Sequence, residues 1–208
     1  MGKYPKIQSV FKRDPANKNK TFLFGQYSTP EIEYLANNDW VFTEKVDGTN
    51  VRVMIDGQGG LTFGGKTNNA QLPTKLFERL TERFRPQQDA LAAAFPDGAC
   101  LYGEGYGTGI QSGGNYRPDQ DFVLFDVRVD DWWLKLEGLV DVAAKFGLTL
   151  VPCVGGGTLR TMLAMVEHGF RSAWGDFTAE GIVARPRVEL RDRNGERIIT
   201  KVKYKDFR

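Results

Sequence analysis

Two strand-like apolar runs flank a short polar segment, and this arrangement constrains the fold more than any other part of the chain. The runs are residues 40–44 and 51–55, and Lys45-Val46-Asp47-Gly48-Thr49-Asn50 lies between them. An ordinary hairpin turn would explain the segment. A lysine at such a junction can also become a nucleophile if its surroundings lower its proton affinity, and the glycine beside it would let a phosphate approach the backbone.

Further strand patterns occupy both ends of the chain. Residues 40–56 and 60–66 are expected to form strands around the glycine-containing turn at residues 56–60, and strands are also predicted at residues 101–104, 122–129, 181–187 and 197–204. Gly155-Gly156-Gly157 is expected to be a turn.

Helical patterns lie between these strands. Pro73 opens a helix that ends at Pro86, with an apolar face made of Leu76, Phe77, Leu80 and Phe84. A short helix is expected at residues 88–95. Another covers residues 134–146, with Gly147 following it and with the apolar residues Leu136, Leu139, Val140, Ala143 and Phe146. Thr158 is expected to cap a helix that runs to His168, for which we expect a structural role. This order predicts an α+β fold with mostly antiparallel sheets.

Composition says little about partners until its distribution is considered. The chain has 208 residues, of which 41% are hydrophobic, and this supports a core, while the formal net charge is only +2. Between residues 183 and 208, however, nine basic residues against four acidic ones give +5. Such a segment suits a polyanion, and a solvated charged face is the alternative.

The cysteines and the hydropathy indicate a cytoplasmic protein. Cys100 and Cys153 lie in apolar contexts, as expected for reduced core residues. No apolar run is long enough to cross a bilayer, and the chain does not open on a signal segment. We expect no membrane association.

Several motifs follow Lys45 in a fixed order. They are Lys66-Thr67, Leu101-Tyr102-Gly103-Glu104-Gly105, Asp121-Phe122-Val123-Leu124-Phe125-Asp126, Glu180-Gly181-Ile182-Val183 and Lys201-Val202-Lys203. The glycines at positions 103, 105, 107 and 109 superficially suggest a dinucleotide-binding or kinase loop. The residues after them predict a loop and no helix, so no helix N-terminus is available for a pyrophosphate.

This order of motifs resembles the covalent nucleotidyltransferases, the superfamily of ATP-dependent ligases and mRNA capping enzymes. The resemblance covers roughly residues 40 to 207 and is closest to the RNA ligase 2 type, the phage and kinetoplastid-editing RNA ligases. It depends most on residues 103–111, on Asp121-Phe122 and Phe125-Asp126, and on Glu44-Lys45 with Gly48-Thr49-Asn50.

The resemblance implies a nucleotidyltransferase domain of the ATP-grasp-like ligase type. We expect it to be single and to cover residues 1–208, without the C-terminal OB or helical domain that ligases of this superfamily usually carry. The resemblance implies catalytic roles for Lys45, Glu180, Lys201 and Lys203. It implies nucleotide contacts from Glu44, Asn50, Lys66, Glu104, Phe122, Lys201 and Lys203, with Phe122 stacked on adenine. It also implies that Glu180 and Glu104 hold Mg²⁺ or Mn²⁺. Arg52 is a further candidate for a phosphate contact, and a surface position is the alternative.

The chemistry explains why these residue types would be needed. An amine that attacks the α-phosphate of ATP must first lose its proton, and nearby cations favour its neutral form. The same cations stabilise the charge that develops on the phosphate. Lys201 and Lys203 alternate on a predicted strand, so both should point to one face. Mg²⁺ prefers a few carboxylates together with water and phosphate oxygens.

The resemblance implies an ATP-dependent RNA ligase that joins 5′-phosphate and 3′-hydroxyl ends through a lysyl-AMP intermediate. We expect a monomer, with RNA and ATP as partners, where the RNA is a nicked duplex, single-stranded ends or an RNA–DNA hybrid. The resemblance to phage ligases also allows a phage-encoded protein that acts in a host cytoplasm. A capping-type guanylyltransferase that uses GTP and a non-catalytic nucleic-acid-binding relative are the alternatives.

Overall fold

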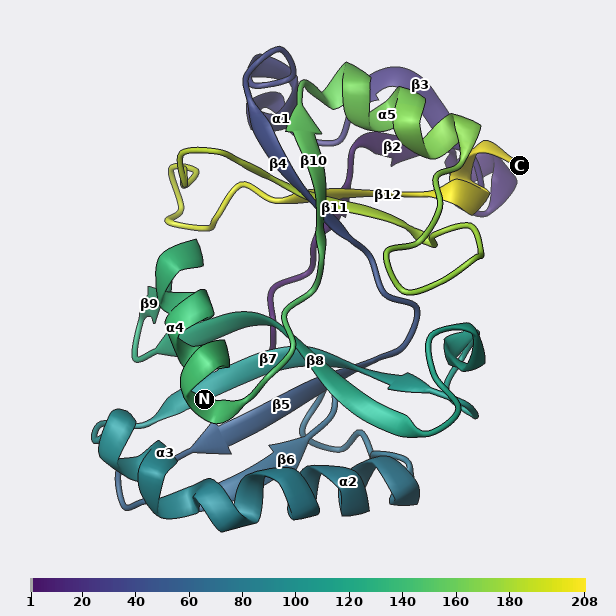
Figure 1. Cartoon of the computed structure of the whole chain (residues 1–208). Helices are drawn as coiled ribbons and strands as arrows, with labels where there is room; N and C mark the ends of the chain where they lie inside the picture. Colours follow the sequence, from purple (N-terminus) through teal and green to yellow (C-terminus); the bar gives the residue numbers. More distant parts are fainter. Residues whose placement is uncertain (1) are drawn as a thin grey trace. The chain divides into compact units, whose positions relative to one another are not determined.

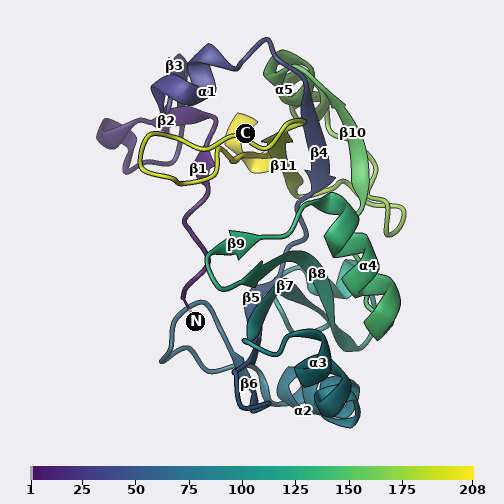
Figure 2. The same ribbon diagram turned by 90° about the vertical axis from the view of Figure 1, so that its left-hand side faces the viewer.

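The computed structural model describes residues 2–208, and their contacts divide them into two compact units. The first unit contains residues 2–5 and Asp47–Val151, and the second contains Lys6–Val46 and Pro152–Arg208. Each unit has a five-stranded sheet and an apolar core of its own, and Figures 1 and 2 show their elements.

The sheet of the first unit has the strand order β6-β5-β7-β8-β9, and every neighbouring pair in it is antiparallel. The strands are β5 (Thr49–Ile55), β6 (Leu61–Gly64), β7 (Ala99–Gly107), β8 (Gln120–Val129) and β9 (Trp132–Trp133). The helices are α2 (Thr74–Phe84), α3 (Gln88–Ala94) and α4 (Leu136–Phe146), with the 3-10 turns η2 (Arg85–Gln87) and η3 (Gly113–Asn115). The three helices and one face of the sheet share a single apolar core.

The predicted helical faces are right in part. Leu76, Leu80 and Phe84 recur every four residues and are fully buried, whereas Phe77 lies at the edge of this stripe and is exposed. In α4 the buried face contains Leu139, Val142, Ala143 and Phe146. Leu136 and Val140, which we had placed on it, are exposed.

The sheet of the second unit has the strand order β1-β12-β11-β4-β10. Its strands are β1 (Gln8–Ser9), β4 (Trp40–Glu44), β10 (Cys153–Gly157), β11 (Gly181–Pro186) and β12 (Thr200–Lys203). The pairing of β1 with β12 is parallel, and the other pairs are antiparallel. A separate hairpin joins β2 (Phe11–Arg13) to β3 (Phe22–Tyr27), with the 3-10 turn η1 (Pro15–Asn17) between them.

Two α-helices and a terminal 3-10 turn complete the second unit: α1 (Pro30–Tyr34), α5 (Leu159–His168) and η4 (Tyr204–Phe207). The prediction that Thr158 caps α5 is confirmed, since its hydroxyl accepts a hydrogen bond from the backbone N–H of Thr161. Both helices, the hairpin and one face of the sheet contribute to one apolar cluster.

Two expectations about local structure are wrong. Gly155-Gly156-Gly157 belongs to the edge strand β10, which pairs with β4, and is not a turn. Gly155 and Gly157 have φ angles of +151° and +133°, and such backbone is open chiefly to glycine. Cys100 is buried, as predicted for a core cysteine, whereas Cys153 is exposed because it opens this edge strand.

The α+β fold with mostly antiparallel sheets is confirmed. No helix within residues 2–208 is both long and apolar enough to cross a membrane.

Candidate active site

Lys45 directly follows β4, and the segment that it opens is not a hairpin turn. β4 pairs with β10 and β11, whereas β5 belongs to the other sheet, so the two strands on either side of the segment are not paired with each other. The backbone N–H of Lys45 donates to the carbonyl of Gly181 at 2.9 Å. This bond fixes Lys45 beside the residue that opens β11.

A shared carboxylate joins two of the predicted catalytic lysines. The Nζ atom of Lys45 lies 2.6 Å from Oε2 of Glu180, and the Nζ atom of Lys203 lies 2.6 Å from Oε1 of the same side chain. All three side chains are mostly but not completely covered. Two ammonium groups and one carboxylate leave one excess positive charge, which suits a phosphate.

The main chain holds Glu180 in this position. It immediately precedes β11, and its carbonyl accepts a hydrogen bond from the backbone N–H of Tyr204. A Cβ atom on Gly181 would lie 2.1 Å from the carbonyl oxygen of Val202. Only glycine therefore allows β11 and β12 to approach closely enough for Glu180 to reach Lys203.

Lys201 lies two residues before Lys203 on β12, on the same half-buried face of the strand. The prediction that these two lysines share one face is confirmed. Lys45, Glu180, Lys201 and Lys203 therefore come from three neighbouring strands of one sheet, or from the residue directly beside such a strand.

Glu44 is buried and already has protein partners. One carboxylate oxygen accepts from the hydroxyl of Ser172 at 2.5 Å, and the other accepts from the backbone N–H of Ala173 at 2.8 Å. The Ser172 hydroxyl accepts in turn from the backbone N–H of Trp174. Glu44 thus anchors the loop at residues 172–174 next to Lys45, and its contact with a nucleotide stays a prediction.

The first unit places Asn50 and Glu104 opposite each other on β5 and β7. The side-chain oxygen of Asn50 is buried and has no hydrogen-bond partner among residues 2–208. A Cβ atom on Gly48 would lie 2.2 Å from the carbonyl oxygen of Gly105. This glycine therefore serves close approach of the chain to β7, where the sequence had suggested close approach of a phosphate.

Lys66 is exposed in the loop after β6, and Arg52 supports that loop. Arg52 is only 1% exposed, which corrects the expectation of a surface position, whereas its contact with a phosphate stays a prediction. Its Nε donates to the carbonyl of Gly65 at 2.8 Å, and its Nη2 donates to Oδ1 of Asn68 at 3.1 Å. These two acceptors lie on either side of Lys66 in sequence.

Phe122 is a core residue, so its predicted stacking on adenine is corrected. Its ring is 0% exposed and packs 5.6 Å from the ring of Phe84. Phe122 lies opposite Gly105, whereas Val123 lies opposite Glu104, so Phe122 faces away from the side that carries Glu104. No face of this ring is open to a base.

Asp121, beside Phe122, fixes the start of β8 through a buried cluster of charges. It accepts from the backbone N–H of Phe122 at 2.9 Å and pairs with Arg83 at 2.9 Å and with Arg117. Burial alone would raise the pKa of Asp121, but the backbone hydrogen bond and the guanidinium groups of Arg83, Arg117 and Arg79 outweigh it and lower this pKa.

Asp47 organises the glycine-rich loop after β7. Its carboxylate accepts from the backbone N–H of Ser112 at 3.2 Å, and its own backbone N–H donates to the hydroxyl of Tyr116 at 3.1 Å. The motif that contains Lys45 is therefore tied to a loop that begins about sixty residues later in the sequence.

Comparison with known proteins now decides the family. A model of the RNA ligase family matches residues 38–203, which include every predicted site residue. The chain belongs to the RNA ligase family.

Solved RNA ligases from Naegleria gruberi have a similar fold. A structure with PPi is 18% identical with a TM-score of 0.67 and aligns over 98% of this chain and 58% of its own. A variant with ATP and Mn is 18% identical with a TM-score of 0.66, over 99% of this chain and 60% of its own. The present chain thus spans about three fifths of the length of these structures.

Phe125 is a better candidate than Phe122 for stacking on adenine, and the sequence analysis did not identify it. Phe125 is half-buried, and its ring lies 5.0 Å from the ring of Tyr4, which also packs 5.1 Å from Tyr102. Tyr102 is two residues before Glu104 on β7, so Phe125 lies on the face that carries Glu104. The signal that the sequence offered was the two-residue alternation of a strand, which places Phe125, three residues after Phe122, on the opposite face. In β8 a bulge also lies at this position.

The predicted metal ligands do not form a cage of protein side chains. Within residues 2–208, no group of three or more His, Cys, Asp or Glu side chains is arranged to hold a metal ion. Glu180 and Glu104 belong to different units, and Glu180 is engaged by two lysines. A single carboxylate such as Glu180 or Glu104 can still serve Mg²⁺, which completes its coordination with water and phosphate oxygens.

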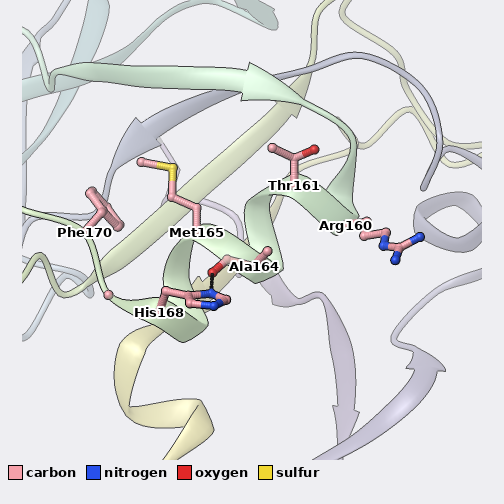
Figure 3. A pocket seen from close by; sticks show the side chains of 7 residues that line it. Arg160, Thr161, Ala164, Met165, His168 and Phe170 are labelled. Carbon is pink, nitrogen blue, oxygen red and sulfur yellow. Dashed lines mark hydrogen bonds between the residues drawn. The ribbon is translucent and has the colours of Figure 1, made fainter.

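An open pocket of about 610 Å³ lies along α5, and none of the predicted site residues lines it (Figure 3). Arg160, Met165, His168 and Phe170 line part of it. The His168 ring nitrogen Nδ1 lies 2.7 Å from the carbonyl oxygen of Ala164, one turn earlier in the same helix. This contact agrees with a structural role for His168.

Proposed function

We propose that this protein is an ATP-dependent RNA ligase that joins 5′-phosphate and 3′-hydroxyl ends, as the RNA ligase 2 type does. The observation that carries the proposal is the Lys45–Glu180–Lys203 cluster within a chain of the RNA ligase family. The Naegleria ligases with PPi, with ATP and Mn, and with AMP and Mn supply the nucleotide chemistry by analogy.

The first step forms a covalent bond to the protein. Lys45 Nζ gives up a proton and attacks the α-phosphorus of ATP, so a P–N bond forms while the P–O bond to pyrophosphate breaks. Glu180 must release the Lys45 amine for this attack, and its carboxylate is placed to accept the proton. Lys201 and Lys203 then face the phosphate and stabilise its developing charge.

Two further transfers complete joining. An oxygen of the RNA 5′-phosphate attacks the same phosphorus, which breaks the P–N bond and returns the amine to Lys45. The 3′-hydroxyl then attacks the 5′-phosphate, and AMP leaves as the new phosphodiester forms. Lys203 keeps the Glu180 carboxylate in place while Lys45 carries AMP.

Residues of the first unit would bind the nucleoside part of ATP. Asn50 offers a buried oxygen without a partner among residues 2–208, which fits a hydrogen-bond donor on the ligand. Glu104 lies across from it, and Lys66 would contact phosphate or ribose. We assign the adenine-facing role to Phe125. Glu180 and Glu104 are each candidates to hold a divalent cation, which would neutralise phosphate charge when bound.

The decisive experiment compares nucleotides and products. The purified chain is incubated with Mg²⁺ or Mn²⁺ and α-labelled ATP or GTP, and label on the denatured protein is measured beside joining of 5′-phosphate and 3′-hydroxyl RNA. We expect the denatured protein to carry label from ATP, and we expect joined RNA among the products. Labelling from GTP alone would indicate a guanylyltransferase, and no labelling would indicate a non-catalytic relative.

A further inference from the structure

A cluster of four phenylalanines reaches the surface of the second unit, and we call it the aromatic platform. Phe11 and Phe22 form its buried base, and Phe24 and Phe207 lie above them. The ring of Phe24 lies 5.8 Å from Phe11, 5.9 Å from Phe22 and 5.8 Å from Phe207. Although it packs against three rings, Phe24 is 60% exposed. A supported and exposed ring of this kind offers a flat face to a ligand.

The elements that carry the platform are rich in exposed lysines. Lys12, Lys18 and Lys20 belong to the β2–β3 hairpin, and Lys205 belongs to η4. Figures 1 and 2 show the hairpin beside the C-terminal turn.

The acidic residues of the same elements are engaged within the protein. Asp14 accepts a hydrogen bond from the backbone N–H of Ala16, and the buried Asp206 pairs with Arg13 at 2.7 Å. The four exposed lysines outnumber these two carboxylates, so the outer surface is positively charged, which complements a polyanion.

Arg13 connects the platform rigidly to the candidate active site. Its guanidinium lies 4.8 Å over the ring of Phe22 and also donates to the carbonyl of Lys20. Its partner Asp206 accepts from the backbone N–H of Lys203 at 2.9 Å. Phe207 follows Lys203 by four residues of 3-10 turn, which is about 8 Å of rise.

We propose that the aromatic platform binds single-stranded RNA next to the end that is joined, and this rests on the proposed ligase function. Bases stack on Phe24 and Phe207, while the lysines hold the phosphates. Aromatic side chains beside a basic surface are the usual means of binding single strands without sequence preference. Bases within a duplex are stacked on each other, so the platform discriminates in favour of single strands.

The test measures binding of the 208-residue chain to a fluorescent single-stranded RNA and to a duplex of the same length. Phe24→Ala should weaken single-strand binding by about tenfold, because one stacked base is lost, and should leave duplex binding and adenylylation unchanged. Phe24→Trp should restore single-strand binding. Tyr34→Ala is the matched control, since Tyr34 is 85% exposed on α1, follows the acidic residues Glu31 and Glu33, and should have no effect.

A salt series separates stacking from charge. Phe24→Ala should leave the dependence of log affinity on log salt unchanged, whereas Lys18→Ala with Lys20→Ala should reduce this slope by about 1.4, or about 0.7 for each single-strand phosphate. Wild-type affinity in Phe24→Ala, or equal losses on single strand and duplex, would overturn the proposal. The proposal would also be overturned if the unmodified chain is a dimer in solution and Phe24→Ala is a monomer, because Phe24 would then belong to a subunit interface. Failure of the ligase proposal would appear separately, as missing adenylylation in the unmodified chain.

Discussion

At the scale of single residues, the candidate chemistry depends on one carboxylate that contacts two lysines. Each Glu180 oxygen lies 2.6 Å from a different Nζ atom, so the amide of glutamine could satisfy one contact but not both. Glu180→Gln should lower the adenylylation rate by roughly 100- to 1,000-fold, as the loss of one positioned charged or polar group does elsewhere. A quench-flow measurement at saturating ATP and metal checks this. Glu189→Gln, on the exposed loop after β11, should behave as wild type.

The two phenylalanines of β8 separate binding from packing. Phe125→Ala should raise the KM for ATP with little change in stability, because the side chain is half-buried on the Glu104 face. Phe122→Ala should lower the free energy of unfolding by about 3–5 kcal/mol, because it leaves a cavity in the core. Urea unfolding and adenylylation kinetics on both variants check the assignment. A normal KM in Phe125→Ala would remove Phe125 from the nucleotide site.

At the scale of elements, the sequence predicts what local pattern encodes. Thr158 indicated the start of α5, and the spacing of Leu76, Leu80 and Phe84 indicated α2. The glycines of β10 have no side chains to show a pattern, so that strand was missed. The short strands β1 to β3 depend on tertiary pairing, such as that of β1 with β12, and no local signal could reveal it.

The approach of β11 to β12 makes a prediction about one glycine. Gly181→Ala would place a Cβ atom 2.1 Å from the carbonyl of Val202, so the strands must separate and Glu180 must move from Lys203. The free energy of unfolding should fall by about 1–3 kcal/mol, as in overpacked cores, and adenylylation should fall with it. Gly138→Ala in α4 is the control, since its nearest neighbour would lie 3.4 Å away and alanine favours helix. Equal stability of the two variants would contradict this account.

The start of β8 should show a pH dependence of stability that belongs to Asp121. Its pKa is lower in the folded chain than its ordinary value of 3.8, so ionised Asp121 stabilises the fold above that value. The contribution is lost as the pH falls through the lowered pKa. Asp121→Asn should therefore be less stable than wild type at pH 7 by about 2 kcal/mol, with a difference that shrinks below pH 4. Urea unfolding across this range checks the sign, and a difference that grows toward acid would contradict it.

At the scale of the whole molecule, the order of motifs predicted the family, and the order of strand and helix patterns predicted the α+β fold, but neither predicted the contacts. Lys45 and Glu180 are 135 residues apart and meet because β4 pairs with β11. The resemblance named both residues, whereas periodicity alone could not have paired their strands. The resemblance also named Phe122 as the residue that stacks on adenine. The register of β8 against β7 instead places Phe122 on the face of the sheet opposite to Glu104.

The central claim is that Lys45 carries AMP, and peptide mass spectrometry tests it most directly. The chain is incubated with ATP and Mg²⁺, digested under conditions that preserve phosphoramidates, and searched for peptides heavier by one AMP. We expect the added mass on Lys45, and its absence in Lys45→Met, which should remain folded with an unchanged far-UV circular dichroism spectrum. AMP on Lys201, Lys203 or another lysine, or an adduct that persists in folded Lys45→Met, would contradict the account.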